Sequence, residues 1–184
     1  VMYANGEHCA ALVGFGATFG IKPVTEVDEL PAAIQQASKL ELLPRGMICC
    51  PLMHGTGIWL GAMISHLAGG AAITVDKLGL DPDLLWSEAQ RHRASFMTIV
   101  GDAFARPLLN ALEEASLKQT PYDLSNLKMM ISSGVMWSQE VKEGLLAQHE
   151  MTLFDAIGSS EGGMGSSIST REASSNTAKF ELSP

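Results

Sequence analysis

Short apolar runs alternate with helix-like segments along this chain, and that alternation restricts the fold more than any other feature. Five runs have the length and composition of strands: residues 47–50, 71–75, 95–100, 127–131 and 151–157. The intervals between them are too long for hairpins, so consecutive strands need crossover connections. The sequence therefore predicts an α/β fold in which a mostly parallel sheet has helices on both faces.

Helix signals fill the intervals. Asp81, Pro82 and Asp83 form a helix start, because aspartate can cap, proline fits the first helical position and acid favours the positive helix end. Other helices are expected from Asn5 to residue 13, over 32–40 and 57–67, from 102 or 106 to about 115, and from Ser138 to 147. Beyond residue 162 the pattern ends, which predicts a loop over 165–177 and the beginning of a partnerless strand at 180–182.

A stretch without charged residues imitates a membrane span. Residues 46–75 contain no Asp, Glu, Lys or Arg over 30 positions, which is long enough to cross a bilayer. The stretch also contains Pro51, two histidines and several glycines. A strand, a turn, a buried helix and a second strand therefore explain it better, and no transmembrane segment is predicted.

Composition narrows the class of protein. The chain has 184 residues, of which 46% are apolar, so it can form one domain or part of a larger one. Its net charge of −8 without a basic run makes nucleic acid and anionic membranes poor partners. Cys9, Cys49 and Cys50 lack C-x-x-C spacing and are interpreted as buried thiols of a reducing, cytoplasmic compartment, without a zinc site.

The segment FDAIGSSEGG, residues 154–163, has the clearest chemical signal. Gly158 is expected to begin a loop at the carboxyl end of a strand, where open α/β sheets bind ligands. Ser159 and Ser160 can donate hydroxyl hydrogen bonds to phosphate oxygens, and the Glu161 carboxylate can ligate Mg²⁺. The segment therefore predicts a phosphate and magnesium site, while a polar turn without function stays open as the alternative.

The same segment fits a second motif that the rest of the sequence opposes. Residues 158–162 match G-x-S-x-G, the nucleophile elbow of α/β-hydrolases. That elbow requires a following helix, whereas glycines and serines come next, and glycine in particular disfavours helix. It also requires an acid and then a histidine downstream, but all five histidines lie upstream. A serine hydrolase is therefore not expected.

Three spaced motifs together resemble the adenylate-forming acyl-CoA synthetases. They are PLMHGTG at 51–57, SSGVMWS at 132–138 and DAIGSSEGG at 155–163, and VGDAFARPLL at 100–109 resembles the fatty and very-long-chain branch. The resemblance covers essentially the whole chain. It implies that residues 1–184 are a single partial domain, the central part of the large N-terminal domain. The family's phosphate loop would precede Val1, and its lysine-bearing C-terminal domain would follow Pro184.

The resemblance also implies an activity and a set of site residues. The family activates a carboxylic acid, here a fatty or other hydrophobic acid, with ATP to an acyl-adenylate and transfers the acyl group to coenzyme A. By position, Glu161 would bind Mg²⁺, Ser160 would contact the α-phosphate, and His54 would lie beside the acyl carboxylate. Ser133 and Gly134 would lie between adenine and the acyl group. The adenine-binding strand end is implied at Asp155, Ala156, Ile157, Gly158, Ser159 and Ser160.

Partners and alternatives complete the prediction. The implied partners are a hydrophobic acid, ATP with Mg²⁺, and coenzyme A, and a homodimer is one assembly to consider. Ile157 stands where the family often has an aromatic residue, so it would cover adenine without stacking. Two other classes stay open: a non-catalytic α/β scaffold or interaction module, and a Rossmann-type oxidoreductase. The latter lacks its glycine fingerprint, because Phe19 stands where the third glycine of G-x-G-x-x-G would be.

Overall fold

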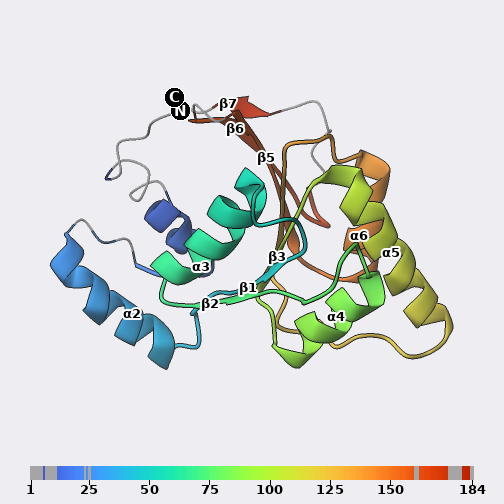
Figure 1. Cartoon of the computed structure of the whole chain (residues 1–184), viewed down its shortest axis with the longest axis horizontal. Coiled ribbons are helices and arrows are strands. Elements are labelled where there is room, and N and C mark those ends of the chain that lie inside the picture. The colour runs from blue at the N-terminus through green and yellow to red at the C-terminus, as the bar shows by residue number, and fades with distance from the viewer. Residues whose placement is uncertain are drawn as a thin grey trace.

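The computed structural model describes residues 6, 12–22, 24, 26–159, 162–173 and 180–182, arranged as one sheet with helices (Figure 1). Its elements, with η marking 3-10 and π segments, are η1 Phe15–Phe19, η2 Val27–Glu29, α2 Leu30–Lys39, β1 Arg45–Ile48, η3 Thr56–Met63, α3 Ile64–Leu67, β2 Ala71–Ile73, α4 Pro82–Arg91, β3 Phe96–Ile99, α5 Gly101–Leu117, β4 Met129–Ser133, α6 Gln139–Gln148, β5 Thr152–Ser159, β6 Gly162–Ser169 and β7 Glu181–Leu182. The sheet order is β2-β1-β3-β4-β5-β6-β7. Strands β1 to β5 pair in parallel, and β6 and β7 are antiparallel, so the predicted α/β class is confirmed.

Helices cover both faces of the sheet, as predicted (Figure 1). Helices α4, α5 and α6 share one core cluster with Met47, Met97 and Met130, which come from three neighbouring parallel strands. The second cluster joins Ile64 of α3 to Phe96 on the opposite face. Because successive strand residues point to opposite faces, Phe96 and Met97 belong to different layers.

The helix predicted over 57–67 is a π-helical segment, η3, followed by the single α-turn α3. Gly61 allows η3 to lie close to the sheet, since a Cβ there would be 3.0 Å from both Ile48 Cγ1 and Thr98 Oγ1. The Ser65 hydroxyl donates back to the Gly61 carbonyl at 2.9 Å, a type of bond that bends helices. Close packing thus accounts for the uncharged stretch. Within the described residues, no helix has both the length and the apolar character that crossing a bilayer requires.

Three predictions near the C-terminal end are wrong. Gly158 does not begin a loop, because β5 continues to Ser159 and its last two residues pair with Gly163 and Gly162 of β6. Residues 165–169, predicted as loop, form most of β6, and alternate positions along them are buried. Their side chains are small and mostly polar, so hydrophobic alternation could not reveal the strand. Strand β7, expected to lack a partner, pairs with β6.

The helix starts are confirmed in part. Asp81 Oδ1 accepts a hydrogen bond from the Leu84 amide at 3.0 Å, and Pro82 is the first helical residue of α4, as predicted. Ser138 precedes α6, but its buried hydroxyl has no hydrogen-bond partner within the described part of the chain. The helix predicted from Asn5 falls largely on residues outside the description.

Two of the three cysteines are buried free thiols, as predicted. Burial raises the pKa of both Cys49 and Cys50, which keeps the thiols protonated and unreactive. Cys9 lies outside the described residues.

Candidate functional site

Three segments that follow the carboxyl ends of parallel strands meet at one edge of the sheet. Residues 51–57 come after β1, residues 134–138 come after β4, and the third segment is the β5–β6 hairpin. Ser133 at the end of β4 is paired with Ala156 of β5. The Thr56 hydroxyl donates to the Ser133 carbonyl at 3.3 Å, which links the first segment to the second. The three motifs therefore gather at the edge where open α/β sheets bind ligands.

His54 of the first segment lies next to Gly134 of the second segment. Gly134 has a φ of 95°, which favours glycine, and a Cβ built there would lie 3.0 Å from His54 Cε1 and 3.2 Å from its Nε2. His54 Nδ1 accepts a hydrogen bond from the Thr56 amide at 3.2 Å. The side chain of His54 is exposed at this edge and is not a core histidine.

The start of α5 holds residues 134–138 in place, a role that the motifs alone did not reveal. The Gly101 amide donates to Ser132 Oγ at 2.9 Å, and the Ser138 amide donates to Asp102 Oδ1 at 2.8 Å. The Asp102 amide in turn donates to the Met136 carbonyl at 3.2 Å. Gly101 has a φ of 55°, and a Cβ there would lie 2.6 Å from the Met136 carbonyl oxygen. In the sequence, the only sign of this role was that Gly101 and Asp102 stand where a predicted strand gives way to a predicted helix.

Asp155 stabilises the site from beneath rather than at the open edge. Its side chain is buried, and Oδ2 accepts a hydrogen bond from Lys142 Nζ of α6 at 2.8 Å. Burial raises the pKa of Asp155, and this effect outweighs the opposing effect of Lys142. Lys142 Nζ also lies 5.4 Å from the centroid of the buried Trp137 ring. The next residues of β5 become accessible in turn, with Ala156 half-buried and Ile157 41% exposed.

Large apolar side chains are exposed in all three segments. We call this set the apolar rim: Leu52, Met53, Val135, Met136 and Ile157. Met53 is 94% exposed and Met136 is 73% exposed. Single exposed apolar residues are common on protein surfaces, but a group of them at one edge of a sheet indicates a binding surface.

Part of the predicted site lies outside the described residues. This holds for Ser160 and Glu161, the predicted α-phosphate and Mg²⁺ residues, and for the Ser159 side chain. No group of three His, Cys, Asp or Glu side chains that could hold a metal ion occurs within the ranges that the structure describes. The role of Glu161 therefore stays a prediction. Strand β6 begins at Gly162, where a nucleophile elbow would need a helix, which agrees with the argument against a hydrolase.

Sequence comparison identifies the family. The family described as AMP-binding enzyme matches residues 24–180. A medium/long-chain-fatty-acid–CoA/3-oxocholest-4-en-26-oate–CoA ligase of Mycolicibacterium smegmatis is 31% identical over 131 residues, which are 69% of this chain and 23% of that protein. A 3-oxocholest-4-en-26-oate–CoA ligase of Rhodococcus rhodochrous is 36% identical over 121 residues, or 62% of this chain and 20% of the relative. The chain thus spans less than a quarter of the length of these relatives.

Solved structures share the fold. The adenylation domain of a keto acid-selecting NRPS module, bound to keto acyl adenylate, matches with a TM-score of 0.60 at 17% identity. The matched region covers 77% of this chain and 29% of the NRPS chain. The amide bond synthetase McbA from Marinactinospora thermotolerans matches with a TM-score of 0.54 at 19% identity, over 74% of this chain and 26% of the McbA chain. These likenesses support the fold alone, whereas the family match extends over most of the sequence. The chain belongs to the family of AMP-binding enzymes.

Proposed function

We propose that this chain forms part of an ATP-dependent acid–thiol ligase, which activates a fatty or other hydrophobic carboxylic acid as its acyl-adenylate and transfers the acyl group to coenzyme A. The observation that carries the proposal is the meeting of the three motif segments and the apolar rim at one sheet edge. The names of the relatives, ligases of medium and long fatty acids and of a cholestenoate, support a hydrophobic acid. Family membership argues against both the oxidoreductase and the scaffold alternatives.

The adenine ring would lie between the second segment and the hairpin. Gly134 has no side chain to hinder a flat ring, and Ile157 offers an exposed apolar surface to cover it. Contacts from residues 155–158 would be made by the backbone, because the Asp155 carboxylate is already bound to Lys142. Van der Waals cover without aromatic stacking predicts a weaker hold on adenine than a tyrosine would give.

His54 would orient the carboxylate of the acid. Since Nδ1 accepts from the Thr56 amide, the neutral ring carries its proton on Nε2, which can donate to one carboxylate oxygen. The other oxygen would then attack the α-phosphorus of ATP, forming the acyl–phosphate bond while pyrophosphate leaves. The negative charge that builds on the phosphate oxygens would be met by the Ser160 hydroxyl. Glu161 would hold Mg²⁺, which neutralises phosphate charge when bound.

Location and assembly are parts of the same proposal. Buried, protonated thiols at Cys49 and Cys50 suit a reducing cytoplasm. A homodimer stays a prediction that multi-angle light scattering of the purified enzyme would check.

Replacement of Glu161 tests the proposal. In a ligase of full family length that carries these 184 residues, Glu161→Ala should slow single-turnover adenylation by roughly 10²–10³-fold, the loss expected for one strong transition-state stabiliser. It should also raise the Mg²⁺ concentration needed for half-maximal rate. Glu150→Ala is the matched control, since Glu150 is an exposed carboxylate just before β5. An unchanged rate and an unchanged Mg²⁺ dependence in Glu161→Ala would show that Glu161 is a turn residue without a role in metal binding.

A further inference from the structure

A cavity lies at the opposite, amino edge of the parallel strands. Its volume is about 630 Å³, within the range of small-molecule sites. Arg45 begins β1, Ser95 directly precedes β3 and Lys128 directly precedes β4, so these lining residues share the edge where the parallel strands start. None of the residues that line the cavity belongs to the three segments of the candidate active site.

Positive charge is concentrated in this cavity. Arg45, Arg93 and Lys128 all line it, and none of the three forms a close ion pair with a carboxylate in the described part of the chain. Asp123, which is not part of the lining, attracts Arg93 at longer range. The lining contains one carboxylate, Glu41. The chain as a whole has a net charge of −8, so this cluster opposes the overall charge.

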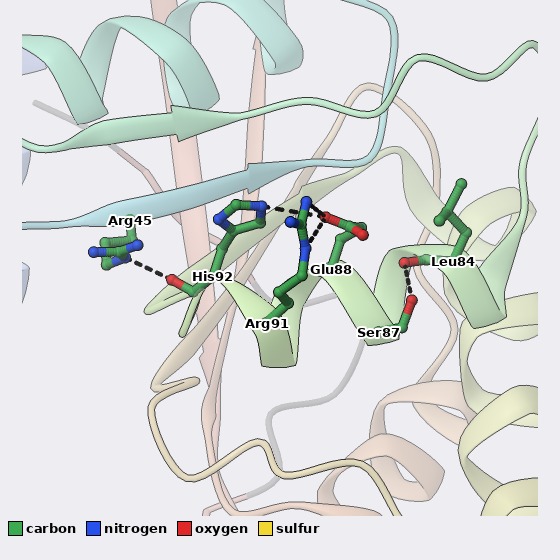
Figure 2. A network of polar contacts seen from close by, with 6 residues as sticks. All are labelled: Arg45, Leu84, Ser87, Glu88, Arg91 and His92. Carbon is green, nitrogen blue, oxygen red and sulfur yellow. Dashed lines mark hydrogen bonds and ion pairs between the residues drawn. The ribbon is translucent and has the colours of Figure 1, made fainter.

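Each of the three cations is held by a neutral partner. Arg45 Nε donates to the His92 carbonyl at the C-terminal end of α4 at 2.6 Å, as Figure 2 shows. Arg93 Nη2 donates to Asn126 Oδ1 at 3.2 Å. Lys128 Nζ donates to a loop carbonyl, that of residue 125, at 2.7 Å. A guanidinium has five N–H donors and an ammonium three, so one such bond fixes the group and leaves donors for a ligand.

Two helix ends form part of the cavity wall. Arg93 and Glu41 have φ values of 52° and 56°, in the left-handed region. Each stands one residue after the C-cap of a helix, α4 and α2 respectively, where glycine is normally preferred. Only one other non-glycine residue within the described ranges, Gln119, has a positive φ. Gln119 also follows a helix C-cap, that of α5, so helix termination accounts for all three conformations. The ends of α4 and α2 thereby place Arg93 and Glu41 at the cavity.

We propose that this cavity binds an amphiphilic organic anion, at a site separate from the candidate active site. Its carboxylate or phosphate head would contact Arg45, Arg93 and Lys128, because guanidinium and ammonium groups match both kinds of head. Its apolar body would pack against the half-buried Phe19 and Leu42. A free phosphate would leave these apolar side chains uncovered, and a neutral lipid would leave the cations without a partner.

Isothermal titration of the 184-residue chain with octanoate and octyl phosphate tests the ligand class. At least one of the two should bind, with an affinity that falls as the salt concentration rises, and the tighter of the two identifies the head group. Octanol, which lacks the charge, and inorganic phosphate, which lacks the apolar body, should each bind at least about tenfold more weakly. Octanol binding as tightly as the anions, or no binding of either anion, would overturn the proposal.

Variants locate the site. Lys128→Ala should weaken binding about tenfold through loss of a charge-assisted contact, and Glu41→Gln should strengthen it by removing the one carboxylate. Arg93→Gly should bind more weakly and yet melt at a higher temperature, because it removes a cation and relieves the left-handed residue. Gln119→Gly makes the same backbone change at α5 and should alter only the melting temperature. Wild-type affinity in both Arg93→Gly and Lys128→Ala would refute the site.

A further variant separates the two edges of the sheet. Binding that is lost in His54→Ala but retained in Lys128→Ala would belong to the candidate active site, and the inference would fail. Binding that is weakened in Lys128→Ala and unchanged in His54→Ala is the expected result.

Discussion

Gly134 is the residue whose replacement should disturb the candidate active site most selectively. Its φ is 95°, and a Cβ there would lie 3.0 Å from the His54 imidazole. Gly134→Ala is therefore expected to displace the histidine or the 134–138 segment and to slow adenylation at least tenfold, by the misplacement of a positioning group. The measurement is single-turnover pyrophosphate release by a full-length ligase that carries this chain.

Gly79 offers a matched control. Its φ is 81°, and a Cβ there would have no neighbour within 4 Å. Gly79→Ala should therefore lose stability through backbone strain alone and keep the wild-type rate. Similar rates in the two variants would show that contact between Gly134 and His54 does not matter for adenylation.

The buried pair of Lys142 and Asp155 should contribute to folding chiefly as a pair. Their side chains are 2% and 6% exposed, so Lys142→Ala would leave a carboxylate buried without its cation. We expect a loss of about 3 kcal/mol in the free energy of unfolding. The double variant Lys142→Met/Asp155→Leu removes both charges and should lie closer to wild type. Urea denaturation of the single and double variants gives the coupling energy, and additive losses would contradict the argument.

Residues with a proposed chemical role were easier to name from the sequence than residues that position them. His54, Ser133 and Gly134 were named because their motifs resemble those of a known family, and they lie together at one sheet edge while their roles stay predictions. Ser132 was not, although its hydroxyl accepts from the amide of Gly101, 31 positions away in the sequence. Such a bond between distant segments leaves no local pattern, and only the folded arrangement of β4 and α5 reveals it.

At the scale of elements, the end of α5 is a site where stability can be gained. Gln119 follows the C-cap Lys118 with a φ of 58°, a conformation that glycine adopts without steric cost. Gln119→Gly should raise the free energy of unfolding by about 0.5–1 kcal/mol and the melting temperature by about 1–4 °C. Leu117→Gly, in the last turn of the helix and 85% exposed, should instead lower it by about 1 kcal/mol. Calorimetry that shows a loss in both variants would mean that the cap is not strained.

Elements with a strong hydrophobic period were predicted well, and elements built from small residues were not. The strands β1, β3, β4 and β5 and the helix α4 were found within a few residues of their observed bounds. Strand β6 was missed because six of its eight residues are Gly or Ser and carry almost no hydrophobic signal, whereas backbone pairing with β5 needs none. The π-helical turns of η3 were also invisible, since close contact with the sheet through Gly61 is a tertiary effect.

At the scale of the whole molecule, the 184-residue chain by itself should not adenylate an acid at a useful rate. It spans 20–23% of the related ligases, and adenylyl transfer needs charge stabilisation from several sides at once. Its net charge of −8 also gives no general attraction for ATP. Pyrophosphate release with ATP, Mg²⁺ and a panel of fatty acids is the assay. Turnover near the ~10 s⁻¹ typical of enzymes would show that a full catalytic set lies within these residues.

The layered packing around the sheet has an optical consequence. Trp86 and Trp137 are fully buried in the layer that contains α4, α5 and α6, while Trp59 is half-buried in the opposite layer. Trp137 belongs to the segment of residues 134–138 that follows β4, and its ring lies beside the Lys142 ammonium group. Its fluorescence should respond to any displacement of that segment, so the emission spectrum of the unlabelled protein carries a signal from its own candidate active site.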